Sequence, residues 1–193
     1  MRSITRSVAI TVCLVFALAL SGVAAGAKRD ATPKQWVSVF CGSIVTWQHT
    51  ITTTSAKLNK TFAQLKRTGK ANAPTVKRKL VSGLTVMVKA TTAMIGKIKA
   101  VGPPSIENGA KLQSAVLSGL GLVKKAFTQA LTSARRLPTK DPKQFSKQGL
   151  AVAKTLQGSS NRIRSAFVPV QQYATKELND AAANDASCKK LAG

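Results

Sequence analysis

The chain has 193 residues, of which 30 are Lys or Arg and only 6 are Asp or Glu, so its formal net charge is +24. With one histidine and scattered carboxylates, it contains no Ser-His-Asp set, no pair of catalytic carboxylates and no phosphate-binding loop, and we expect no enzymatic activity. The excess of positive charge favours polyanionic partners but carries no information about the fold.

The first 27 residues have the order of a secretory signal peptide: the basic residues Arg2 and Arg6, then an apolar run, then small residues. Ala25 and Ala27 form an A-x-A pair, so we expect cleavage after residue 27. We expect residues 28–193 to fold as a single helical domain that is secreted or resides in the periplasm or cell envelope. In the alternative, residues 8–27 remain as an N-terminal membrane anchor, because their length just spans a bilayer.

Two helices are predicted in the first half of the domain. The sequence TPKQ at residues 32–35 is a capping box that begins a helix, and apolar residues then recur in steps of three and four until Gly69. A second apolar stripe, with heptad spacing, follows Pro74 and continues to Val101, where the sequence GPP ends it.

Two further helices are predicted in the second half. A third stripe extends from about Pro104 to Leu137. The sequence DPKQ at residues 141–144 begins a fourth helix, which contains the sequence GSSN at residues 158–161 and then Pro169. Because a proline removes a helix hydrogen bond and disfavours helix at the preceding residue, we expect a kink or a short fifth helix after Pro169.

These patterns predict an all-α fold, an up-down-up-down four-helix bundle in which short connections make neighbouring helices antiparallel. Cys41 and Cys188 are the only cysteines after residue 27, and we expect them to form a disulfide, with two free thiols or an intermolecular bond as the alternatives. A straight fourth helix would place Cys188 about 30 Å beyond the level of Cys41, so the chain must turn back after Pro169, with a second turn at residues 183–185.

In this topology the first and third connections lie at the end opposite the cysteines, and many cations converge there. We call this set the basic pole, and it consists of Lys66, Arg67, Lys70, Lys77, Arg78, Lys79, Arg135, Arg136, Lys140, Lys143 and Lys147. Asp141 is the only acid beside it. The remaining acids are expected at or near the cysteine end: Asp30, Glu107, Glu177, Asp180 and Asp185.

We expect the basic pole to bind anionic polymers or membrane surfaces without sequence specificity and with a strong dependence on salt. An envelope polymer or acidic lipid head groups are the expected partners. Sequence-specific binding of nucleic acid is not expected, because Phe145 is the only aromatic residue within the cluster. In the alternative, the charge serves solubility alone.

Two other functions stay open at this point. One is a ligand- or lipid-binding bundle with an apolar interior cavity near Met87, Phe127, Gly119 and Gly121. The other is a bundle that pairs with another protein, and the sequence does not define its oligomeric state. We expect no metal and no cofactor: there is no CxxC and no CxxCH, and His49 lies beside the main apolar stripe of its helix rather than within it.

Overall fold

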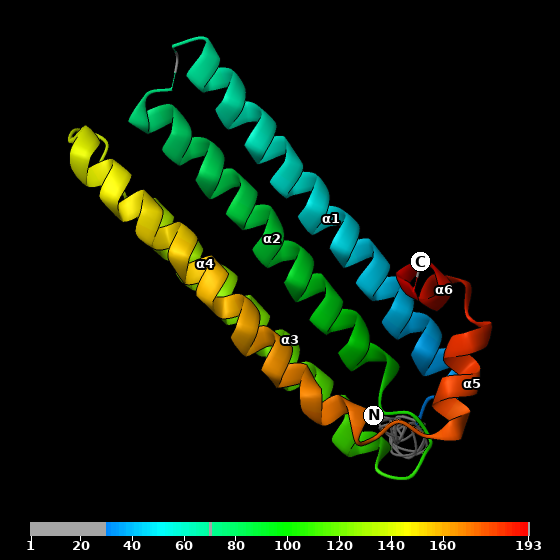
Figure 1. Cartoon of the computed structure of the whole chain (residues 1–193). Helices are drawn as coiled ribbons and strands as arrows, with labels where there is room; N and C mark the ends of the chain where they lie inside the picture. Colours follow the sequence, from blue (N-terminus) through cyan, green and yellow to red (C-terminus); the bar gives the residue numbers. More distant parts are fainter. Residues whose placement is uncertain (1–29, 70, 193) are drawn as a thin grey trace, which may run out of the picture.

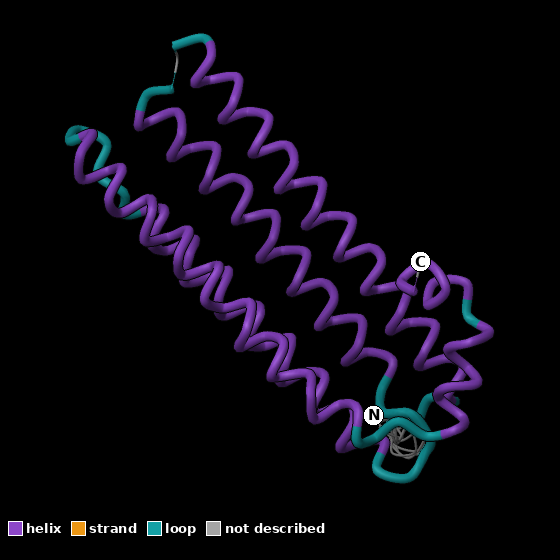
Figure 2. The backbone as a smooth tube through the Cα atoms, in the orientation of Figure 1, coloured by secondary structure: helices purple, strands orange, loops and turns teal. Residues whose placement is uncertain are grey.

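The computed structural model describes residues 30–69 and 71–192, and in these ranges the chain forms six helices and no β-strand (Figures 1 and 2). The all-α prediction is therefore confirmed. The helices are α1 (Pro33–Arg67), α2 (Ala73–Val101), α3 (Gly109–Arg135), α4 (Pro142–Gln171), α5 (Lys176–Asn184) and α6 (Ala186–Ala192). The predicted signal peptide, with its cleavage site and its alternative as an anchor, lies outside the described residues. No described helix has the length and apolar character needed to cross a membrane.

Helix α1 begins at the predicted capping box. Thr32 Oγ1 accepts a hydrogen bond from the backbone N–H of Gln35 (3.2 Å), and Gln35 Oε1 accepts one from the backbone N–H of Thr32 (3.1 Å). These bonds satisfy donors that the start of a helix otherwise leaves free, which favours a start at this position. At its other end α1 stops at Arg67, and Gly69 adopts the left-handed conformation (φ 68°) that often follows a helix.

The third helix begins at Gly109, so the predicted start near Pro104 is wrong. Residues 103–108 form a connection that pairs with the start of the domain: Ala31 N–H donates to the carbonyl of Pro103 (2.8 Å), and Ser105 N–H donates to the carbonyl of Ala31 (2.7 Å). Asn108 has a positive φ of 58°, which a right-handed helix does not permit. The apolar stripe continued across this connection because Ile106 also packs against the core.

The end of the chain turns back as predicted. Helix α4 continues through residues 158–161 and through Pro169 to Gln171, so neither feature ends it. A turn then leads to α5, whose N-cap Thr175 accepts a hydrogen bond from the backbone N–H of Leu178, and the predicted short fifth helix is confirmed. A second turn at Asp185 separates α5 from α6, which also agrees with the sequence-based expectation.

The four long helices lie lengthwise beside one another, and α5 and α6 lie at one end of them (Figure 1). Packing follows the order of the chain: α1 packs on α2, α2 on α3 and α3 on α4, while α5 and α6 pack on α1. Within the described ranges, α4 has no interface of similar extent with α1. The contacts therefore show a succession of packed helices, and the closed four-helix bundle stays a prediction.

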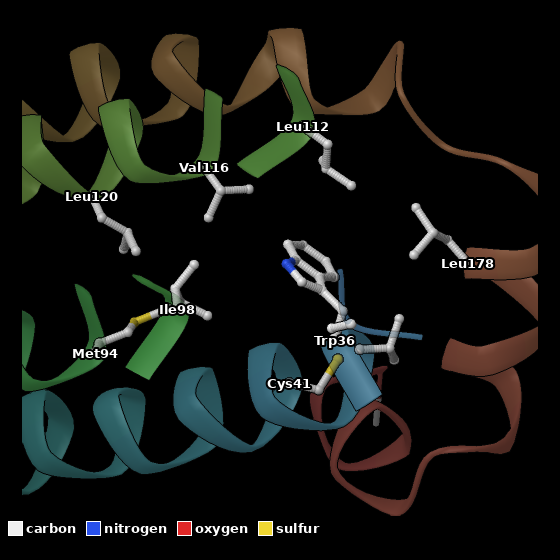
Figure 3. Packing of buried hydrophobic residues seen from close by; sticks show 10 residues of the cluster. Trp36, Cys41, Met94, Ile98, Leu112, Val116, Leu120 and Leu178 are labelled. Atoms are coloured by element: carbon white, nitrogen blue, oxygen red, sulfur yellow. The ribbon is translucent and has the colours of Figure 1, made fainter. Parts of the chain in front are cut away.

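Two clusters of buried side chains form the core. The first lies at the end that carries α5 and α6, where Trp36 of α1 projects between Leu112 and Val116 of α3 and Ile98 of α2 (Figure 3). The second lies toward the opposite end and includes Leu84, Ala134 and Leu137, with Val152 contributed by α4. Side chains of α1, α2, α3 and α4 contribute to both clusters, so the same helices are packed together at both ends.

Candidate functional site

The predicted disulfide between Cys41 and Cys188 is present, with an Sγ–Sγ distance of 2.04 Å and a Cα–Cα distance of 5.0 Å. It joins the first turns of α1 to α6 across 147 positions of sequence. The bond is packed closely, since Cys41 is buried and a Cβ placed on Gly42 would lie 3.7 Å from Ser187 Oγ. The disulfide thus holds the returning C-terminal segment against α1, which is a structural role.

Asp185 caps α6 beside this disulfide. Its Oδ1 accepts hydrogen bonds from the backbone N–H groups of Ser187 (2.8 Å) and Cys188 (2.9 Å). These bonds, the one from Cys188 above all, lower the pKa of the Asp185 carboxyl because they stabilise its charged form. In the described ranges, Asp185 and the two sulfurs are the one group of three potential metal ligands that lie within 4.8 Å of one another. Because each sulfur is bonded to the other, the group offers no thiolate ligand.

The structure brings most members of the basic pole to one end of the molecule. Figures 1 and 2 show the α1–α2 and α3–α4 connections at the end of the long helices that is opposite α5 and α6. A hydrogen bond links the start of α2 to the α3–α4 connection, since Lys77 Nζ donates to the backbone carbonyl of Leu137 (2.8 Å). Lys77 is half-buried, and the other described members of the pole are exposed. Lys70 lies outside the described residues.

Lys77 differs from its neighbours in what it does. Its ammonium group satisfies a carbonyl just beyond the end of α3, where a helix leaves its last carbonyls without partners. It is therefore a structural contact between α2 and the α3–α4 connection rather than a free charge. The sequence offered no signal for this role, because Lys77 stands beside Arg78 and Lys79 in an unbroken run of cations.

Asp141, the acid at the basic pole, is the N-cap of α4. Its Oδ1 accepts a hydrogen bond from the backbone N–H of Gln144 (3.0 Å). A carboxylate at this position also interacts favourably with the partial positive charge of the helix N-terminus. The presence of one acid at the pole is thus explained by the start of the helix.

Positive charge also extends along the body of the molecule. Helices α1, α2 and α3 contain no Asp or Glu, so their exposed lysines, such as Lys57, Lys99 and Lys125, have no acidic residue on the same helix. The ion pair seen in the described part of the chain joins Lys176 and Asp180 on α5 (2.6 Å). The lack of acids on α1 and α2 could be read from the sequence, since no acid occurs between Asp30 and Glu107.

The residues considered for an interior ligand site fall in different places. Met87 is buried and Phe127 packs against the second core cluster, whereas Gly121 is exposed and a Cβ there would contact nothing within 4 Å. His49 is exposed. Leu150 and Val168 of α4 are more than half exposed, and the pairing of the bundle with another protein stays a prediction.

Two apolar pockets occur elsewhere. One, of about 220 Å³, lies at the cysteine end between α1 and α5, where Phe40, Tyr173 and Leu178 line it. The other, of about 370 Å³, lies between α1 and α2 at Trp47. Neither pocket is lined by Met87, Phe127, Gly119 or Gly121.

The fold and these surfaces define a class: a helical protein in which a disulfide joins the first helix to α6, and whose four long helices contain lysine and arginine but no Asp or Glu. Comparison of the chain with protein-family models, with curated proteins and with solved structures gave no match.

Proposed function

We propose that this protein is a non-enzymatic binding protein whose basic pole attaches to anionic polymers or to acidic lipid head groups. The observation that supports the proposal is the Lys77–Leu137 hydrogen bond, because it holds the cation-rich start of α2 against the cation-rich α3–α4 connection, beside a single acid. Exposed like charges that lack acidic neighbours repel one another, and a bound polyanion relieves this repulsion. The contacts would be mostly lysine contacts, which act as flexible point charges and carry little sequence specificity.

The proposal includes the up-down-up-down four-helix bundle, since that topology places the two connections together. Short connections and packing in chain order support it, as does a second core cluster that draws side chains from α1, α2, α3 and α4. Spin labels at Thr68 and Thr139 test it by pulsed electron paramagnetic resonance. We expect a clearly shorter distance for this pair than for Thr68 and Ser105, and equal distances would exclude the bundle.

We also propose that the protein acts outside the cytoplasm, in the envelope or in the medium. A disulfide that closes almost the whole domain is typical of oxidising compartments, and the predicted signal peptide agrees with this location. Cell fractionation followed by mass spectrometry of the N-terminus tests it. Recovery of an intact N-terminus in the cytoplasmic fraction would contradict the proposal.

The basic pole itself is tested by the retention of purified protein on vesicles of acidic lipid and on a soluble polyphosphate, over a series of salt concentrations. The test variant carries Arg78→Glu, Lys79→Glu, Arg135→Glu and Arg136→Glu. The matched control carries the same four charge reversals at exposed lysines away from the pole: Lys34→Glu, Lys99→Glu, Lys111→Glu and Lys125→Glu. Circular dichroism checks the helical fold of both.

We expect the pole variant to bind at least about tenfold more weakly. Its binding should also depend less on salt, because a protein that makes fewer phosphate contacts releases fewer counterions. The control should keep most of its affinity. Equal loss in both variants would assign binding to the whole cationic body instead of the pole. No binding of the parent protein at low salt would show that its charge does not serve polyanions.

A further inference from the structure

An apolar groove lies on the surface between α1 and α2, near the middle of the molecule. Its volume is about 370 Å³, within the range of about 300 to 1,000 Å³ that is usual for small-molecule sites. Thr46, Trp47 and Thr50 of α1 and Val86, Ala90 and Met94 of α2 are among the residues that line it. This space would admit a slender molecule, but not a helix together with its side chains.

The walls of the groove have little hydrogen-bonding capacity to offer. The indole N–H of Trp47 donates to Thr91 Oγ1 (3.0 Å), and the Thr91 hydroxyl donates to the carbonyl of Met87 (2.9 Å). The hydroxyls of Thr46 and Thr50 donate to backbone carbonyls one helical turn earlier, each at 2.9 Å. Because these donors are already used, the groove suits a hydrocarbon rather than a polar ligand.

The rim of the groove carries charge of one sign. Lys89 and Lys97 are both exposed, and they are separated by about 12 Å along the axis of α2 because each residue adds about 1.5 Å. Neither α1 nor α2 contains an acid that could pair with them. Ala90 and Ala93 lie between the two lysines in the sequence, and their small side chains do not obstruct the groove. Val86 at one end of the groove is 40% exposed.

We infer that this groove binds the hydrocarbon chain of a single-chain anionic amphiphile, a long-chain fatty acid, whose carboxylate is held at the rim by Lys89 and Lys97. The apolar wall would bury the chain, and two unpaired ammonium groups complement the head group. A second copy of this protein does not fit, since its acid-free helices would bring like charges together. The site is distinct from the basic pole, which lies at the end of the helices.

Quenching of Trp47 by a brominated fatty acid tests the inference. The protein has two tryptophans, and a Trp36→Phe variant leaves Trp47 as the only emitter. This background is suitable because the buried indole N–H of Trp36 has no hydrogen-bond partner in the part of the chain that the structure describes, and phenylalanine removes that donor. We expect saturable quenching at fatty acid concentrations below those that form micelles. Quenching that rises in proportion to concentration, without saturation, would overturn the inference.

Charge and location are tested by matched variants. Lys89→Glu with Lys97→Glu should raise the dissociation constant about tenfold, whereas Lys99→Glu, on the same helix but outside the groove, should change it less than about twofold. The brominated methyl ester should bind more weakly than the acid. Equal effects of the rim and control variants, or equal binding of ester and acid, would overturn the role of the lysines.

Two more measurements distinguish the site from others. The Trp47→Phe variant, in which Trp36 alone reports, should show little quenching, and strong quenching there would place the ligand in the pocket at the cysteine end instead. Displacement of the fatty acid by an acidic amphipathic peptide would indicate a protein partner and overturn the inference. The four-residue pole variant should bind the fatty acid as the parent does, so this result is independent of the proposed polyanion binding.

Discussion

The cysteine end (residues 31–43, 102–112 and 170–192) and the basic pole are held together by different kinds of interaction. At the cysteine end a disulfide joins α1 to α6, the backbone of Ala31 pairs with residues 103–105, and Leu178 brings α5 into the core. At the basic pole the Lys77–Leu137 hydrogen bond links α2 to the α3–α4 connection, and the Leu137 side chain packs in the second core cluster. Covalent and backbone contacts thus support one end, and side-chain contacts support the other.

The two ends also differ in charge: most acids lie at the cysteine end, and a cluster of cations lies at the basic pole. Glu107, Glu177, Asp180 and Asp185 lie at the cysteine end, where Asp185 caps α6 and Asp180 pairs with Lys176. At the basic pole the described cations other than Lys77 are exposed, with Asp141 as the nearby acid. Exposed charges in water are screened and cost little stability. The covalent link and the exposed cations of the basic pole therefore lie at opposite ends, and we expect those exposed cations, unlike Lys77, to be replaceable without loss of the fold.

The largest effect should follow removal of the disulfide by Cys41→Ser with Cys188→Ser. Closing a loop of 147 residues contributes about 3 to 5 kcal/mol to the free energy of unfolding, since it restricts the unfolded chain. Urea unfolding measures the loss. Hydrogen exchange should show that α5 and α6 lose protection first, and equal loss in residues 136–147 would contradict the separation of the two regions.

Each end of the molecule contains a glycine whose replacement by alanine should lower stability. A Cβ on Gly109, at the cysteine end, would collide with the backbone carbonyl oxygen of Pro104, so Gly109→Ala should cost about 3 kcal/mol. Gly69, near the basic pole, has space around it but a φ of 68°, so Gly69→Ala should cost about 1 kcal/mol. Thermal unfolding measures both. Gly69→Asn serves as the control, because asparagine tolerates this conformation; a cost for Gly69→Ala as large as that for Gly109→Ala would refute the steric explanation.

Each end of the molecule also has a helix N-cap that can be removed. Thr32→Ala and Asp141→Ala should each lower stability by about 1 kcal/mol, since each removes an N-cap hydrogen bond. Asp141→Asn keeps a side chain that can cap the helix but removes the negative charge. We expect it to retain stability and to bind polyphosphate more tightly than the parent protein. Unchanged binding at low salt would separate Asp141 from the charge balance of the basic pole.

The smallest effect is expected from pH. The pKa of Asp185 lies below the value of 3.8 that is usual for an aspartate, chiefly because the backbone N–H of Cys188 donates to it. Since its pKa is lower in the folded protein than in the unfolded chain, its stabilisation is present above about pH 4 and is lost as the pH falls through the folded value. Amide exchange in α6 should therefore accelerate in acid, and Asp185→Asn should remove this dependence; persistence of the dependence would assign it to Glu177, whose pKa is also lowered.

Much of the fold follows from local features of the sequence. The start of α1 was predictable because a capping box acts within four residues, and the stripes of apolar residues identified the four long helices. The start of α3 was not, since Ile106 continues the apolar pattern while the backbone at Asn108 and the pairing with Ala31 prevent a helix there. The groove at Trp47 was missed as well, because Val86, Ala90 and Ala93 are one position away from the stripe that marks the core of α2.

By itself the sequence determined the helical content, the helix caps, the pairing of the two remaining cysteines and the absence of acids from residues 31–106. These features depend on hydrogen bonds between near neighbours, on the period of the helix, or on composition. The packing of the helices, and no pattern in the sequence, makes Lys77 bond to Leu137 and leaves an outer groove at Trp47. Those contacts join residues far apart in the chain, and their free energy depends on which surfaces the packed helices leave free to meet.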